Sequence, residues 1–185
     1  MIDSKSNHSC NVTAIKSKRK IEKIAIIGVF SAFAAILSYI EVIISFGMFI
    51  PGVKLGLANI AIVVVLYIYG YKYALFVNVI RIIVVGLLFT NAFSIAFSLA
   101  GALISFVVML LLKKLDVFSP LGVSVAGGVS HNIGQLLIAT YIVSSYSVMN
   151  YIPVLMIAGI ICGFIIGITS IGVIRYTKNF LERRI

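Results

Sequence analysis

Six apolar stretches follow one another along most of this chain, and this pattern restricts it to a helical membrane architecture. They cover residues 24–45, 53–70, 73–89, 92–112, 121–145 and 152–175. Each has the roughly 17–25 residues that a helix needs to cross a bilayer. Of the 185 residues, 62% are hydrophobic and only 11% are charged, far more apolar surface than a water-soluble core of this size needs. The sequence therefore predicts an all-α polytopic membrane protein with six transmembrane helices.

Polar segments frame this transmembrane domain. Residues 1–23 are basic and are predicted to form a flexible cytoplasmic tail, and residues 177–185 a short basic C-terminus. The domain between them is expected to span 24–176. Its connections are short, so sequential helices are expected to be antiparallel neighbours.

The distribution of Lys and Arg predicts how the spans are oriented. With the N-terminus inside, thirteen of the 15 cations fall in cytoplasmic tails or loops, and the outward connections carry no charge. The thirteen are Lys5, Lys16, Lys18, Arg19, Lys20, Lys23, Lys72, Lys113, Lys114, Arg175, Lys178, Arg183 and Arg184. Both termini are therefore predicted to be cytoplasmic, in a cell membrane. Because these cations lie in tails and loops, the net charge of +10 does not indicate nucleic-acid binding.

Several kinds of chemistry have no support in the sequence. The chain contains no glycine-rich phosphate loop, no nucleophile elbow and no paired histidine ligands. Magnesium-assisted diphosphate chemistry needs clustered carboxylates, whereas the chain has only five acids and one of them, Glu41, lies in a span. We therefore expect no catalytic residues, no metal site and no cofactor. Cys10 and Cys162 offer neither metal-ligand spacing nor a plausible disulfide.

Polar residues near the outer ends of the first two spans are candidates for a binding site. In the segment 51–60, Lys54 and Asn59 enter the second span, and Glu41 lies near the end of the first. An ionisable group inside a membrane is by default a functional hypothesis. The alternatives are a salt bridge between Glu41 and Lys54 that holds two helix ends, or a lysine that reaches the interface.

Arg81, with Asn78, lies toward the cytoplasmic side of the third span. A long side chain can reach the interface from there, so structural anchoring or contact with a partner protein is favoured over ligand binding.

The densest polar cluster is in the fifth span, where His131, Asn132 and Gln135 share one side of a helix. Such a face is costly against lipid and is expected to point into the bundle. One interpretation is hydrogen bonding between helices, for example to Asn59 or Ser98. The favoured one is recognition of a polar ligand.

Small residues form two stripes that permit close helix contact. Gly159, Gly163 and Gly167 in the sixth span are expected to pack inside the bundle. The stripe in the first span comprises Gly28, Ser31, Ala32 and Ala35, and it could serve either internal packing or docking of another membrane protein.

Three blocks together resemble a known family: residues 51–60, residues 97–102 with Lys113 and Lys114, and residues 122–135. The chain resembles the Gx transporter family, often labelled heptaprenyl diphosphate synthase component I, over roughly residues 24–176. That family is grouped with the substrate-binding S components of energy-coupling-factor (ECF) transporters. The resemblance implies a six-helix S-component fold with a substrate pocket toward the outer side. It also implies a transmembrane T subunit and two ATPase subunits as partners, docked on the small residues of the first span.

The function expected from the resemblance is substrate capture for an uptake transporter, with one small molecule bound between the helices and not converted. The expected binding residues are Lys54, Asn59, His131, Asn132, Gln135 and Glu41. The alternative is a non-catalytic membrane accessory subunit of a heptaprenyl (polyprenyl) diphosphate synthase. A third possibility is a structural membrane protein without a ligand, in which the polar cluster serves packing.

Overall fold

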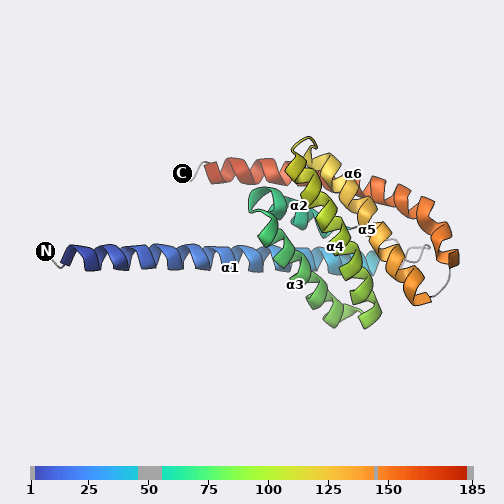
Figure 1. The fold of residues 1–185 in the computed structure, drawn as a ribbon, viewed down its shortest axis with the longest axis horizontal. Helices are drawn as coiled ribbons and strands as arrows, with labels where there is room; N and C mark the ends of the chain where they lie inside the picture. The colour runs from blue at the N-terminus through green and yellow to red at the C-terminus, as the bar shows by residue number, and fades with distance from the viewer. Residues whose placement is uncertain (1–2, 46–55, 144–145, 183–185) are drawn as a thin grey trace.

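The computed structural model describes residues 3–45, 56–143 and 146–182, and all regular structure in them is helical (Figure 1). The helices are α1 (Asp3–Ser45), α2 (Asn59–Ile68), α3 (Tyr71–Phe89), α4 (Ala92–Leu115), α5 (Pro120–Val143) and α6 (Ile152–Glu182), with a short 3-10 helix η1 (Tyr146–Tyr151) before α6. Lys54 and the whole 46–52 connection lie outside the described residues.

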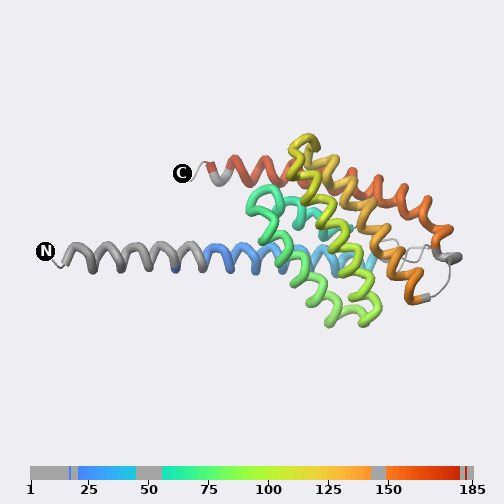
Figure 2. The backbone as a smooth tube through the Cα atoms, viewed as in Figure 1, coloured from blue at the N-terminus to red at the C-terminus, as the bar shows by residue number. Residues whose placement is uncertain are grey.

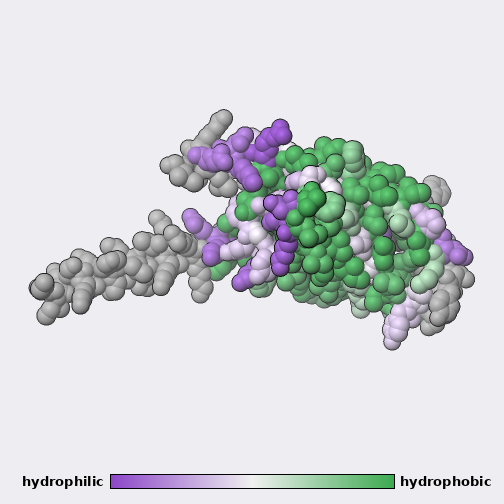
Figure 3. All heavy atoms as spheres, turned by 45° about the horizontal axis from the view of Figure 1, so that its top comes forward, coloured by the Kyte–Doolittle hydropathy of each residue, from purple (hydrophilic) through white to green (hydrophobic). Residues whose placement is uncertain are grey.

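Four segments are long and apolar enough to cross a membrane, which identifies a multi-pass membrane protein. They are Ile21–Ile44, Tyr71–Phe89, Ala92–Leu115 and Met149–Asn179. Apolar side chains cover the middle of the molecule, and hydrophilic ones gather at the end from which α6 projects (Figure 3). The prediction of an all-α membrane protein is confirmed, and six full-length spans remain a prediction.

The second and fifth predicted spans differ from the other four. The α2 helix has ten residues, about 15 Å of helix, which is half the thickness of a hydrocarbon core. The α5 helix has 24 residues, enough to span, but glycines, serines and the polar cluster around His131 and Asn132 lower its hydropathy. These two helices are therefore the ones least suited to face lipid along their whole length.

The N-terminal tail differs from its prediction. Residues 1–23 were expected to be flexible, whereas the structure continues α1 as helix from Asp3 into the first apolar span (Figure 1). The sequence contains no proline in this helix and no glycine before Gly28, so nothing in it interrupts the backbone hydrogen bonds. Figure 2 traces α1 along one side of the bundle.

Two short connections are explained by their residues. Gly70 lies between α2 and α3 and caps the start of α3 with a φ of 96°, a conformation that glycine adopts at little cost. At the other end of α3, Asn91 caps α4 by accepting a hydrogen bond from the Ser94 amide at 2.9 Å. The predicted break at Thr90 and Asn91 is confirmed, and the break predicted at 71–72 lies two residues earlier.

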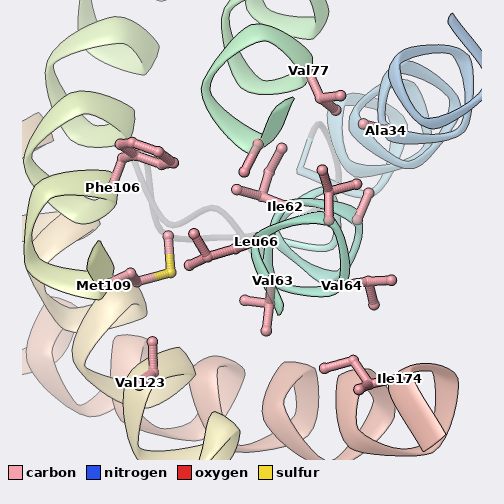
Figure 4. Close-up of a cluster of buried hydrophobic side chains, with 13 residues drawn as sticks. Ala34, Ile62, Val63, Val64, Leu66, Val77, Phe106, Met109, Val123 and Ile174 are labelled. Carbon is pink, nitrogen blue, oxygen red and sulfur yellow. The ribbon is translucent and has the colours of Figure 1, made fainter. Parts of the chain in front are cut away.

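The α2 helix forms the centre of the apolar core. Seven of its residues are buried, because the other helices surround it. Figure 4 shows α2 side chains such as Ile62 and Leu66 facing Val77 of α3 and Phe106 and Met109 of α4. Core contacts from α1, α5 and α6 are made by Ala34, Val123 and Ile174. A short helix enclosed in this way needs no lipid-facing surface.

The contact between α5 and α6 is built from glycines. A Cβ on Gly128 would lie 2.6 Å from the Gly159 carbonyl oxygen, and one on Gly163 would lie 2.7 Å from the Val125 Cα. The Ser124 hydroxyl donates to the Gly163 carbonyl oxygen at 2.9 Å across this contact. The glycine stripe of α6 therefore packs within the bundle, as expected from its spacing.

Candidate functional site

A cavity of about 680 Å³ lies among α1, α2, α3 and α4, with His131 of α5 at its edge. Its volume is within the range of sites that bind small molecules. Its lining residues are Ser38, Glu41, Val42, Gly56, Asn59, Arg81, Ile82, Val85, Gly86, Phe89, Thr90, Asn91, Ser94, Ile95, Ser98 and His131. Among the described residues, the lining therefore combines an apolar wall with one cationic, one anionic and several neutral polar side chains.

Arg81 lies deep in this cavity. It is ten positions from Tyr71 along α3, which places its Cα about 15 Å from that end of the helix. Arg81 shares one face of α3 with Ile82, Val85, Gly86 and Phe89. These residues line the cavity from Arg81 toward the other end of the helix. Because its side chain is only 8% exposed, the guanidinium faces the bundle interior and does not reach the interface.

Hydrogen bonds from three helices fix the orientation of the Arg81 guanidinium. Nε donates to Asn78 Oδ1 at 2.9 Å, and one terminal nitrogen donates to Ser38 Oγ at 3.0 Å. The other terminal nitrogen lies 3.4 Å from Asn59 Oδ1. An arginine side chain has five N–H donors. The described residues accept from three of them, which leaves two for a ligand. Such a guanidinium is pre-oriented to bind an anionic oxygen group.

Glu41 brings a negative charge to the same corner of the cavity. Its Oε1 accepts a hydrogen bond from the Gly56 amide, and its side chain is 6% exposed. The Glu41 carboxylate and the Arg81 guanidinium both line the cavity. Gly56 has a φ of 72°, and its carbonyl oxygen accepts from the Asn59 amide at 2.8 Å. The turn that begins α2 therefore connects Glu41 to Asn59, whose side chain accepts a hydrogen bond from Arg81.

The opposite wall comes from α4 and α5. Asn91, Ser94, Ile95 and Ser98 follow one face of α4, from the connection after α3 inward. His131 reaches this wall because Gly101 lets α5 approach α4. A Cβ on Gly101 would lie 2.8 Å from the His131 carbonyl oxygen and 3.1 Å from its ring carbon Cε1.

The predicted binding residues separate into three groups. Glu41, Asn59 and His131 line the cavity together. Asn132 and Gln135 are buried, but they are not among the residues that line the cavity. The Asn132 amide donates to the Leu155 carbonyl oxygen of α6 at 2.7 Å, and Gln135 lies against Gly101. Lys54 is outside the described residues, so its place in the site stays a prediction.

Arg81 is the cavity residue that the sequence analysis assigned elsewhere. It was interpreted as a structural anchor or a partner contact, because a long side chain could reach the interface. The structure instead turns it inward, toward acceptors on α1, α2 and α3. The available signal was the pair Asn78 and Arg81, whose spacing of three places an acceptor beside the guanidinium on one helix face.

The small-residue stripe of α1 divides between two faces. Ser31 is 6% exposed and belongs to the buried face with Ala34. Gly28 and Ala32 are exposed, and a Cβ on Gly28 would meet nothing within 4 Å. Ala35 is half-buried between these faces. Within the described chain, only the Gly28 and Ala32 part of the stripe is therefore open to another protein or to lipid.

The cavity is equipped to bind by hydrogen bonds and charge. No group of histidine, cysteine, aspartate or glutamate side chains in the described ranges could hold a metal ion. Arg81 supplies N–H donors, Glu41 supplies an acceptor, and Ser94, Ser98 and His131 supply further polar groups. The arrangement fits recognition of a small polar or charged molecule.

Comparison with known proteins gives a family. No curated protein and no solved structure matches the chain. The family model described as heptaprenyl diphosphate synthase component I matches residues 30–172, which include every described residue that lines the cavity. Because this match covers well over half of the sequence, the chain belongs to the heptaprenyl diphosphate synthase component I family.

Proposed function

We propose that this protein is a non-catalytic membrane subunit that binds one small molecule between its helices. The single observation that carries this function is the cavity of about 680 Å³ around the buried Arg81. A buried guanidinium is costly unless it is paired or serves a ligand. Here it lies beside open space, next to an apolar wall, as in a preformed ligand site.

The absence of catalysis is supported by the charges of the site. Diphosphate transfer assisted by magnesium requires several carboxylates, and Glu41 is the one acidic residue in the described lining. Glu41 also accepts a hydrogen bond from the Gly56 amide. The cavity therefore favours holding a molecule over converting it.

Two assemblies could use such a subunit, and the family description favours the first. Its printed name, component I of a heptaprenyl diphosphate synthase, supports association with another component of a prenyl diphosphate synthase. In that assembly, catalysis would belong to the partner. Co-purification of a soluble prenyl synthase with the tagged membrane protein is the expected result.

The second assembly is an ECF-type uptake transporter with a T subunit and two ATPases. It is supported by the position of the cavity along the helices. Lys72 lies at one end of α3, and the lining residues Phe89, Thr90 and Asn91 lie at the other, about 28 Å away. If basic ends are cytoplasmic, the cavity lies nearer the outer surface. The exposed Gly28 and Ala32 would then serve as the contact for the T subunit.

Orientation can be measured with single cysteines in intact cells. After Cys10 and Cys162 are replaced by serine, a cysteine at Asn91 is expected to react with an impermeant reagent from outside. A cysteine at Ser119, in the connection before α5, should react only after the cells are opened. The reverse pattern would exclude a cavity that faces outward and with it the capture role.

Binding itself is tested by native mass spectrometry of the protein taken gently from its own membrane. A retained small molecule is expected in the unaltered chain. It should be lost in Ser94→Phe, which fills the cavity from α4. The matched control is Leu103→Phe on the same helix, where the side chain is 49% exposed. Retention of the molecule in Ser94→Phe would place the binding site elsewhere.

A further inference from the structure

The connection between α4 and α5 exposes apolar side chains at the basic end of the molecule. Val117 is 80% exposed and Phe118 is 47% exposed, and both lie beyond the membrane-length segment Ala92–Leu115. Asp116 precedes them and ends α4 with a φ of 54°, a left-handed conformation that aspartate adopts more often than most residues. Two neighbouring apolar side chains beyond a span have no hydrocarbon core to cover them. A contact with another protein would remove them from water.

Lysines of α4 lie beside these apolar residues. Lys113 and Lys114 belong to its last turn, and Lys114 is exposed. The Lys113 ammonium donates to the Leu66 carbonyl oxygen at 2.5 Å and lies 4.9 Å from the centre of the Tyr67 ring. Both partners belong to α2, which the other helices enclose. Lys113 therefore lies over the centre of this end of the bundle, and not at its lipid-facing edge.

A third cation reaches the same end from α6. Ile174 is buried against α2 (Figure 4), and Lys178 follows it by four residues, so both lie on one face of α6. Lys178 is exposed, because α6 continues to Glu182 past the end of α2 (Figure 1). Arg175 instead shares a face with Ile168, which is 54% exposed. Two cations of one helix therefore have different surroundings: Lys178 faces the end of the bundle, and Arg175 faces its outside.

The apolar and basic residues at this end together have the composition of a docking surface. We call them the end surface: Val117, Phe118, Lys113, Lys114 and Lys178. Hydrophilic side chains gather at this end of the molecule (Figure 3). An apolar centre with cations around it is complementary to an apolar patch bordered by carboxylates. Lipid headgroups surround the sides of a bundle, whereas Lys113 and Lys178 face its end. The end surface is thus better placed to contact a soluble protein than to contact the bilayer.

We propose, building on the association with a soluble synthase component proposed above, that the end surface is the docking site for that component. The chemistry that it recognises is an apolar patch bordered by acidic side chains. Val117 and Phe118 supply the apolar contact, and the lysines orient the partner and exclude basic surfaces. The basic end is cytoplasmic in the orientation proposed above, where a soluble component can reach it.

Two variants of α6 test this surface with the same change of charge. The full chain is placed in nanodiscs of phosphatidylcholine, and the purified soluble prenyl diphosphate synthase of the same cells is titrated onto it by biolayer interferometry. Lys178→Glu should weaken the affinity about tenfold or more, because a carboxylate would then face the acidic border of the partner. Arg175→Glu should leave the affinity within about threefold, because a charge away from the contact is screened by salt. Equal losses in the two variants would overturn the proposal, since they would show attraction by net charge alone.

The apolar contact is tested separately at Val117. Val117→Asp should weaken synthase binding about tenfold or more. Val117→Ile keeps an apolar side chain at this position and should bind as the unaltered chain does. Because Val117 is exposed, neither change disturbs the packing of the helices, so this pair decides if Lys178→Glu fails to fold. Unchanged binding in Val117→Asp would overturn the apolar contact and with it the docking surface.

Nanodiscs that contain phosphatidylglycerol separate a protein contact from a lipid contact. Synthase binding that requires phosphatidylglycerol and is insensitive to Lys178→Glu would assign the cations to lipid and overturn the proposal. No synthase binding in either kind of disc would overturn it as well. The small molecule retained in the cavity, measured by native mass spectrometry on the same preparation, reports the binding function independently. Its presence without synthase binding would leave that function standing.

Discussion

Two regions of this protein contain buried polar side chains, and they use them in opposite ways. Between α5 and α6, Ser124 and Asn132 donate to the carbonyl oxygens of Gly163 and Leu155. Beside α3, Arg81 donates to the side chains of Ser38 and Asn59, and all three border an open cavity. In the first region, the hydrogen bonds join two closely packed helices. In the second, they border a space large enough for a ligand.

The difference comes from what faces the polar residues. Glycines bring the α5 and α6 backbones so close that no Cβ fits at Gly128 or Gly163. In the cavity, Arg81 faces the polar side chains of Ser38 on α1 and Asn59 on α2 instead of a glycine backbone. A dense polar cluster in sequence therefore indicates burial, and the size of the residues opposite it decides whether that burial leaves space.

The largest effect is expected from placing a side chain in the glycine contact between α5 and α6. Gly163→Val would drive a side chain into the Val125 backbone, where a Cβ alone already lies 2.7 Å away. Overpacking against backbone costs about 3 kcal/mol or more, so the variant should lose its monodisperse peak in detergent. Gly172→Val on the same helix, where a Cβ meets nothing within 4 Å, is the control. Equal behaviour of the two variants would contradict the tight contact.

The next effect concerns the cavity. Arg81→Gln removes a charged donor that is pre-oriented by Ser38, Asn59 and Asn78. Affinity for the retained small molecule, compared by native mass spectrometry, should fall about 10- to 100-fold, since hydrogen bonds to charged groups contribute about 1.5–3 kcal/mol. Arg175→Gln, at an exposed position on α6, is the matched control. Unchanged affinity in Arg81→Gln would restore the structural role that the sequence suggested.

A smaller effect is expected from Asn132→Ala. Its hydrogen bond to the Leu155 carbonyl oxygen joins α5 to α6, away from the cavity. Its loss should lower the free energy of unfolding by about 1–2 kcal/mol, measured by denaturant titration in detergent. Affinity for the retained small molecule should stay within about threefold. A selective loss of affinity without a change in stability would make Asn132 a ligand contact, as first predicted.

The smallest effect is expected from Gln135→Leu. Gln135 is buried, and its Oε1 has no hydrogen-bond partner among the described residues. An apolar side chain of similar size removes that unsatisfied acceptor, so thermal stability should be unchanged or slightly higher. Binding should also be unchanged. A tenfold loss of affinity would show that the α5 cluster reaches the ligand.

The class of the fold and most of its helices follow from the amino-acid sequence alone. Apolar runs of membrane length predicted the long helices, and the short polar breaks predicted their connections, including the one at Thr90 and Asn91. These features depend on local composition, because a backbone in lipid must satisfy its own hydrogen bonds as helix. The same local reasoning selected Glu41, Asn59 and His131, which meet in the cavity.

What each polar side chain faces depends on how the helices pack against one another. Helical periodicity places Asn132, Gln135 and Arg81 on helix faces, but it does not say which neighbouring helix lies opposite. Glycines on α4 and α6 fill the space beside Asn132 and Gln135, whereas acceptors on α1 and α2 turn Arg81 inward. The enclosure of the short α2 helix likewise depends on five other helices at once. A binding cavity is a property of such long-range packing, because its volume is set by side chains far apart in the sequence.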